Sequence, residues 1–190
     1  GGVINVGGGD FYINTTVTLG NKVRLIGCGK GATQLIVTVN TIDGIAIASN
    51  ARNVEVASLT ITSKDGVGAS NAAIRCDATN GGADHRYRDI EVNAFFYGFR
   101  CGDIWWDNLL ENIRWNSCNT SFYHSGTGGL SINNLFVKCY SNEPTALGMR
   151  FGPMKNTKLQ SCNFGGHPTI TGKYVSVEGN CYSLKFEGCN

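Results

Sequence analysis

The sequence predicts an all-β protein of the single-stranded, right-handed parallel β-helix class, with about seven to eight coils. A short phrase of alternating apolar and polar residues recurs along the chain at intervals of roughly 22 residues or more. Its period of two is typical of strands, not helices. The 26 glycines suit a chain with many turns. A leucine-rich repeat has a similar period, but its leucine skeleton is absent.

Each copy of the phrase starts with a small polar residue, where we expect the chain to turn into a strand. In the copy that starts at Asn53, Val54 and Val56 are expected to point inward and Glu55 outward. Stacked amides at the first position can hydrogen-bond from coil to coil. The copies are Lys22–Cys28, Asn53–Leu59, Asp89–Phe95, Asn112–Cys118, Asn134–Tyr140, Asn156–Cys162 and Ser183–Cys189. The expected outward column is Arg24, Glu55, Glu91, Arg114, Phe136, Lys158 and Lys185.

A second column of strands follows a small residue in each coil. Guanidinium groups match carboxylates and aromatic rings stack on sugars, so its outward side chains suggest a strip that binds an anionic ligand. A solvated polar face is the alternative. The expected strands are Ile45–Ile47, Ile74–Cys76, Phe99–Cys101, Phe122–His124 and Met149–Phe151, with Ala46, Arg75, Arg100, Tyr123 and Arg150 facing outward.

Composition sets further bounds. The repeat runs without a break, which predicts one domain over residues 1–190. The net charge of +2 is too small to indicate a nucleic-acid partner, and no apolar run is long enough to predict a membrane span. The 8 cysteines fall mostly in inward columns, so we expect free thiols and assembly in a reducing cytoplasm. No cofactor or metal motif is predicted.

Two polar segments interrupt the repeat, at residues 77–88 and 102–111. The adjacent Trp105 and Trp106 should face opposite ways, so that one enters the core and the other can stack on a sugar. Nearby acids could supply the two carboxylates of glycoside hydrolysis. The alternative is that both tryptophans pack in the protein and the acids are solvated turn residues. His85 is a weaker candidate base. The candidate catalytic residues are Asp84, Glu91, Asp103, Asp107 and Glu111, and the candidate substrate-binding residues are Arg100, Trp105, Trp106, Tyr123 and Arg150.

The first 36 residues carry a more specific resemblance. Gly1-Gly-Val-Ile-Asn-Val6, Thr16-Val-Thr-Leu19 and Val23-Arg-Leu-Ile-Gly-Cys-Gly-Lys-Gly-Ala-Thr33 resemble the first coils of the pectate-lyase-like β-helix superfamily, in particular tailspike and depolymerase domains of bacteriophages. The resemblance implies a homotrimer in the virion tail, which binds and often cleaves bacterial surface polysaccharide at the host surface. It also implies a fragment whose partner is the remainder of a longer chain.

Three functions remain open. The first is a phage tailspike domain that binds and degrades capsule or O-antigen, as a hydrolase or a lyase. The second is a non-catalytic β-helix shaft or adhesin. The third is a secreted enzyme of the same superfamily, but the polygalacturonase signatures Asn-Thr-Asp, Asp-Asp, Gly-His-Gly and Arg-Ile-Lys are absent and no acidic calcium cluster is recognisable. Pectin is therefore a disfavoured substrate.

Overall fold

The computed structural model is a parallel β-helix, as predicted. It describes residues 1–190 except 69, 77–81, 127–130 and 166–173, and these described residues form strands and no helix. Every recorded strand pair is parallel, because each coil repeats the direction of the coil before it. None of the described segments is a helix that could span a membrane.

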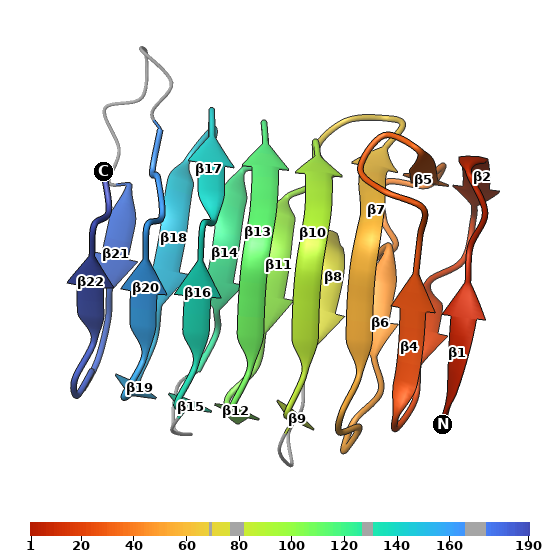
Figure 1. The fold of residues 1–190 in the computed structure, drawn as a ribbon. Helices are drawn as coiled ribbons and strands as arrows, with labels where there is room; N and C mark the ends of the chain where they lie inside the picture. Colours follow the sequence, from red (N-terminus) through yellow and green to blue (C-terminus); the bar gives the residue numbers. More distant parts are fainter. Residues whose placement is uncertain (69, 77–81, 127–130, 166–173) are drawn as a thin grey trace.

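Three sheets run along the helix axis, and we call them the front, rear and short sheets (Figure 1). The front sheet has the main path β1 (Gly2–Asn5), β4 (Val23–Ile26), β7 (Glu55–Ser63), β10 (Arg86–Asn93), β13 (Leu109–Asn116), β16 (Leu135–Val137), β20 (Lys158–Gln160) and β22 (Lys185–Glu187), with β2 (Gly9–Ile13), β5 (Thr33–Val37) and β17 (Tyr140–Asn142) attached. The rear sheet contains β3 (Val17–Leu19), β6 (Ile45–Ile47), β8 (Ala72–Cys76), β11 (Tyr97–Cys101), β14 (Thr120–His124), β18 (Leu147–Phe151) and β21 (Val175–Val177). The short sheet contains β9 (Gly82–Ala83), β12 (Trp105–Trp106), β15 (Ser131–Ile132) and β19 (Met154–Lys155).

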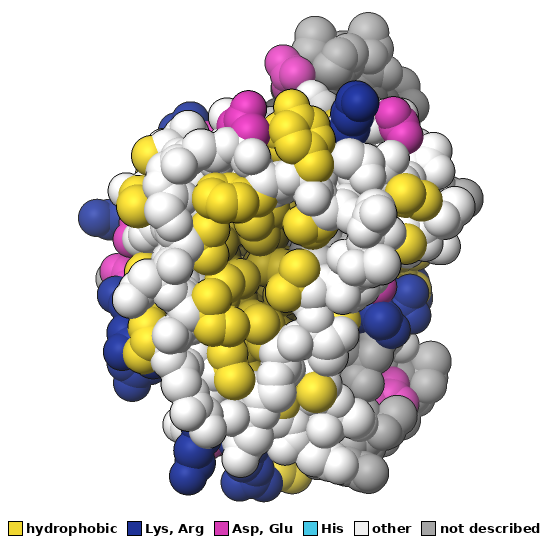
Figure 2. Space-filling model, turned by 90° about the vertical axis from the view of Figure 1, so that its right-hand side faces the viewer, with side chains coloured by type: hydrophobic (Ala, Val, Ile, Leu, Met, Phe, Trp, Pro, Cys, Tyr) yellow, Lys and Arg dark blue, Asp and Glu magenta, His cyan; other side chains and the backbone are white. Residues whose placement is uncertain are grey.

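The winding is right-handed. In Figure 1 the front strands rise and the rear strands descend while the chain advances from right to left. The end that carries β1 leaves apolar side chains uncovered, among them Val3, Ile4 and Tyr12 (Figure 2).

Each coil turns at corners whose residues have a left-handed backbone. The first corner lies between the short and front sheets, and the second bends the front strand in its middle. This conformation costs most L-residues about 1–2 kcal/mol but suits Asn and Asp, whose short polar side chains bond locally. The first corners are Lys22, Asn53, Asp84, Asp107, Asn133, Asn156 and Ser183, and the second include Ser58, Asp89, Asn112, Lys138 and Ser161, all with positive φ.

The corners correct the predicted register of the repeated phrase. Glu55 pairs with Arg86, so the equivalent of Asn53 in the next coil is Asp84 and not Asp89. Phe136 pairs with the buried Leu159 and is itself buried, so its predicted outward position was wrong. The error arose because a polar corner followed by alternating residues occurs twice in one coil.

The second column was predicted in its true register. Ala46, Arg75, Arg100, Tyr123 and Arg150 pair in succession along the rear sheet and face outward. The inward side chains of the same strands build an aromatic stack in which Phe122 contacts Phe99, Trp105, Phe136 and Phe151 at centroid distances between 4.9 and 5.7 Å.

All eight cysteines are free thiols. The sequence predicts one inward column for Cys28, Cys118, Cys162 and Cys189, but the structure splits it. Cys162 follows the second corner at Ser161, whereas Cys118 follows a third corner of positive φ at Ser117, just after the end of β13. Burial raises the pKa of Cys118 to about 12. A thiol in this environment is an apolar packing group and not a nucleophile.

Candidate functional site

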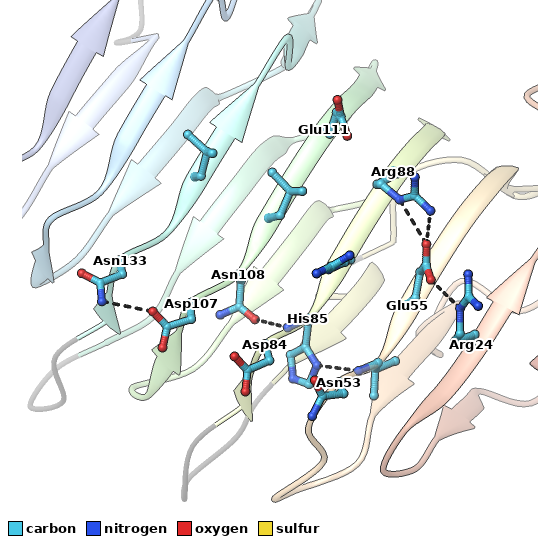
Figure 3. Close-up of a pocket in the computed structure, with 14 residues that line it drawn as sticks. Arg24, Asn53, Glu55, Asp84, His85, Arg88, Asp107, Asn108, Glu111 and Asn133 are labelled. Carbon is cyan, nitrogen blue, oxygen red and sulfur yellow. Dashed lines mark hydrogen bonds and ion pairs between the residues drawn. The ribbon is translucent and has the colours of Figure 1, made fainter. Parts of the chain in front are cut away.

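A groove of about 890 Å³ lies on the outer face of the front sheet (Figure 3). It crosses the first halves of β4, β7, β10, β13 and β16, between the first and second corners. These five strands are separated by four spacings of about 4.8 Å, so the groove is about 19 Å long along the helix axis. The groove therefore has the proportions to hold an extended chain molecule.

The first corners supply a row of polar side chains along one edge of the groove. Asn53, Asp84, Asp107 and Asn133 lie side by side in this row (Figure 3). The backbone N–H groups of Asp84 and Asp107 donate to the carbonyls of the next coil, at 3.1 and 2.9 Å, which fixes their stacking. The row exists because the left-handed corner conformation selects Asn and Asp.

Asp84 and Asp107 occupy equivalent positions of adjacent coils, since Trp106 pairs with Ala83 and Leu109 pairs with Arg86. Equivalent side chains project in parallel, so their carboxylates are separated by about one coil spacing, near 4.8 Å. Asn133 donates its Nδ2–H to the carboxylate of Asp107 at 3.0 Å and thereby orients it.

A buried row of hydrogen bonds supports this edge. The His85 ring accepts the Val54 N–H at Nδ1 (3.2 Å), and the backbone N–H of His85 donates to Oδ1 of Asn108 (2.9 Å). Asn108 in turn donates to Asn134 from both its backbone and its side chain. Burial lowers the pKa of His85 to about 4. The imidazole is therefore neutral at pH 7 and acts as a structural acceptor beneath the groove.

An ion-pair network occupies the end of the groove nearer β1. Glu55 is only 9% exposed at its side chain and lies between Arg24 and Arg88, which are 50% and 40% exposed. Arg24 donates to Glu55 at 2.6 Å, and Arg88 donates both Nε and Nη2 to the other carboxylate oxygen. Burial opposes ionisation of Glu55, but the hydrogen bonds from Arg88 and Arg24 hold its pKa below the ordinary value. Glu55 thus stays charged and fixes both guanidinium groups.

The structure brings three of the five candidate acids to this groove. Asp84 and Asp107 are neighbours, whereas Glu111 lies two outward positions beyond Asp107, about 13 Å along the strand at about 3.3 Å per residue. Glu91 lies past the second corner of β10, where it accepts the side-chain amide of Asn116 at 3.2 Å. Asp103 lies between β11 and β12, where its charge acts on His124, and it does not line the groove.

The candidate binding residues lie elsewhere. Arg100, Tyr123 and Arg150 form a strip on the rear sheet, where Arg150 stacks over the Tyr123 ring at 4.8 Å. Trp105 is fully buried against the aromatic stack, so it has no surface to offer a ligand, which corrects its expected binding role. Trp106 is half-buried on the short sheet, directly before Asp107. The predicted acids and binding residues therefore do not share one surface.

Sequence reasoning did not combine Arg24, Glu55 and Arg88 into a site. They belong to three coils. The predicted outward column placed Arg24 beside Glu55, but it put Glu91 in the next coil where the structure has Arg86, so Arg88 was missed. The tip of the predicted loop, residues 77–81, lies outside the described residues. Among the described residues no group of three or more His, Cys, Asp or Glu side chains is arranged to hold a metal ion.

Solved structures with the same fold include ORF18 of Geobacillus virus E2, with a TM-score of 0.52, 11% identity, and coverage of 97% of this chain and 54% of that chain. The catalytic domain of a GH87 α-1,3-glucanase in complex with tetrasaccharides gives a TM-score of 0.50, 12% identity, and coverage of 99% and 54%. The chain thus spans about half the length of these structures. No protein-family model and no curated protein matches the chain. At such low identity the likeness shows the fold.

Proposed function

We propose that this chain is a carbohydrate-acting β-helix whose groove binds a polysaccharide along the helix axis and cleaves it with Asp84 and Asp107. The observation that carries the proposal is the presence of two carboxylates at equivalent positions of adjacent coils, facing the groove. Glycoside hydrolysis needs such a pair, one group to protonate the leaving oxygen and one to attack carbon or activate water.

The spacing favours a particular mechanism. Retaining glycosidases hold their carboxyl groups about 5–5.5 Å apart, and inverting enzymes about 6.5–9.5 Å apart to admit a water molecule. One coil spacing of about 4.8 Å is close to the retaining value. We assign Asp107 as the nucleophile, because its carboxylate already accepts a hydrogen bond from Asn133. Asp84 is then the acid that protonates the leaving group and later activates water.

The biological role we propose is a phage tailspike domain acting on capsule or O-antigen, outside the host cell and as a homotrimer. It is supported by the resemblance of residues 1–36 and by the shared fold with a phage protein. The glucanase with bound tetrasaccharides shows that this fold can carry glycan chemistry in another protein. A non-catalytic adhesin that uses the same groove is the second candidate, favoured by the fixed ion pairs that stiffen the groove floor.

The test is release of oligosaccharides from purified bacterial capsule or lipopolysaccharide, followed by mass spectrometry. We expect Asp84→Asn, which removes the proposed leaving-group acid, to slow release by about 10²–10⁴-fold, the usual contribution of a positioned acid or base. Asp103→Asn removes the same charge outside the groove and should leave the rate unchanged. Binding without release by the wild-type chain would favour the adhesin, and equal loss in both variants would contradict the assignment of the groove.

A further inference from the structure

The groove carries opposite charge at its two ends. The coils of β4, β7 and β10 supply three arginines, Arg24, Arg86 and Arg88, against Glu55 and Asp84. The coil of β13 supplies Asp107 and Glu111, and none of the groove-lining residues in that coil or the next is basic. A ligand along the groove therefore meets a positive surface first and a negative surface about two coils, or about 10 Å, farther on.

The positive end is organised before any ligand arrives. The bonds to Glu55 use Nε of Arg24 and both Nε and Nη2 of Arg88. A guanidinium has five N–H donors, so each arginine keeps donors for a further acceptor. Both groups stay partly exposed toward the groove, and Glu55 restricts their motion. Fixed guanidinium forks suit carboxylate, sulfate or phosphate groups. Because the two arginines are already ordered, binding an anion costs less side-chain entropy.

The negative end imposes the opposite preference. Glu111 lies on β13 and Asp107 at the corner directly before that strand, and both line the same groove. A second anionic group placed here would meet like charges, and interfaces use such repulsion to reject wrong partners. The sugar at the acid pair should therefore be uncharged.

We propose that the arginine end, formed by Arg24, Arg86 and Arg88, is an anion subsite that selects heteroglycans in which charged and uncharged sugars alternate or are spaced along the chain. The inference rests on the groove being the glycan site. It excludes two simpler classes, neutral homopolymers and polymers that carry a charge on every sugar. The anionic substituent lies over the arginines while the cleaved bond lies over Asp84 and Asp107.

Four polymers test the inference by affinity electrophoresis or calorimetry on the full chain. Hyaluronan alternates glucuronate with a neutral sugar, carboxyl-reduced hyaluronan has lost that charge, dextran is neutral, and polygalacturonate is charged throughout. We expect hyaluronan to bind at least tenfold more tightly than the other three, with an affinity that falls as salt increases. A glycan sulfated once per repeat distinguishes sulfate from carboxylate recognition.

Two variants connect the preference to the arginines. Arg86→Gln removes an exposed charge and Arg88→Lys keeps the charge but loses the planar fork, and each should reduce hyaluronan binding severalfold. Arg114→Gln lies outside the groove on the same sheet and should change nothing. Equal binding of dextran and hyaluronan, or tightest binding of polygalacturonate, would overturn the anion subsite and leave the groove proposal intact. Failure of all four polymers to bind would overturn the subsite and contradict glycan binding as well.

Discussion

Acidification should destabilise the protein through the buried imidazole of His85. The ring accepts the Val54 N–H at Nδ1, so protonation of Nδ1 would place two donors against each other. Burial lowers the pKa of His85 to about 4, from an ordinary value of 6.5. Between these two values the unfolded chain binds the proton and the folded chain does not. The free energy of unfolding therefore falls as the pH falls from 6.5 to 4.

The size of the effect follows from the two pKa values. The full difference between the ordinary pKa of 6.5 and a pKa of about 4 corresponds to about 3 kcal/mol of folding free energy, at about 1.36 kcal/mol for each pH unit. At pH 5 the same linkage gives about 2 kcal/mol, and at pH 7.5 it gives less than about 0.1 kcal/mol. Since small domains are stable by only about 5–15 kcal/mol, a change of this size is easily measured.

The matched variant is His85→Asn, because Asn108 already fills the equivalent position in the next coil and accepts a backbone N–H there. Urea unfolding at pH 7.5 and pH 5 gives the stability of both proteins. The wild type should lose about 2 kcal/mol more than the variant between the two pH values, and His124, also a buried imidazole, cancels in the comparison. A difference below about 0.5 kcal/mol would refute a neutral, buried acceptor at His85.

Other predictions address the core, the buried ladder and the thiols. Phe122→Ala should lower the free energy of unfolding in urea by about 3–5 kcal/mol. Phe186 is 45% exposed, so Phe186→Ala should lower it far less, and similar losses in the two variants would contradict the packing. Asn108→Ala leaves the His85 backbone N–H without its acceptor and removes the side-chain hydrogen bond to Asn134. It should cost about 1–3 kcal/mol by the same assay, and a neutral result would exclude the ladder as a stabilising feature. Without reductant, an alkylating reagent should label eight thiols in the unfolded chain but label Cys28 fastest in the folded chain, and fewer than eight labels after unfolding would reveal a disulfide.

The fold was predictable because the parallel β-helix repeats a simple pattern, and the rear-sheet register of Arg75, Arg100, Tyr123 and Arg150 followed directly from alternation. The front-sheet register was not fully predictable. Its strands bend at a second polar corner, so Asp89 has the same local appearance as Asp84. Local alternation cannot distinguish two corners of one coil when both require a left-handed backbone.

The site was predictable only in its parts. Asp84 and Asp107 were selected from polar segments that interrupt the repeat, but Asp103 and Glu111 were equally good candidates by that criterion. The coil register decides between them, because it places only the first-corner acids side by side. Of the Arg24–Glu55–Arg88 network, the predicted outward column contained only the Arg24–Glu55 neighbours, because the register error placed Glu91 beside Glu55 in the next coil.

The anomeric configuration of the first-released product tests the central claim most directly. If Asp84 and Asp107 act as a pair separated by one coil spacing, proton NMR during cleavage of the bacterial polysaccharide should show retention of configuration at the new reducing end. Inversion would contradict an acid pair drawn from adjacent coils, and an unsaturated sugar at the new non-reducing end would contradict hydrolysis.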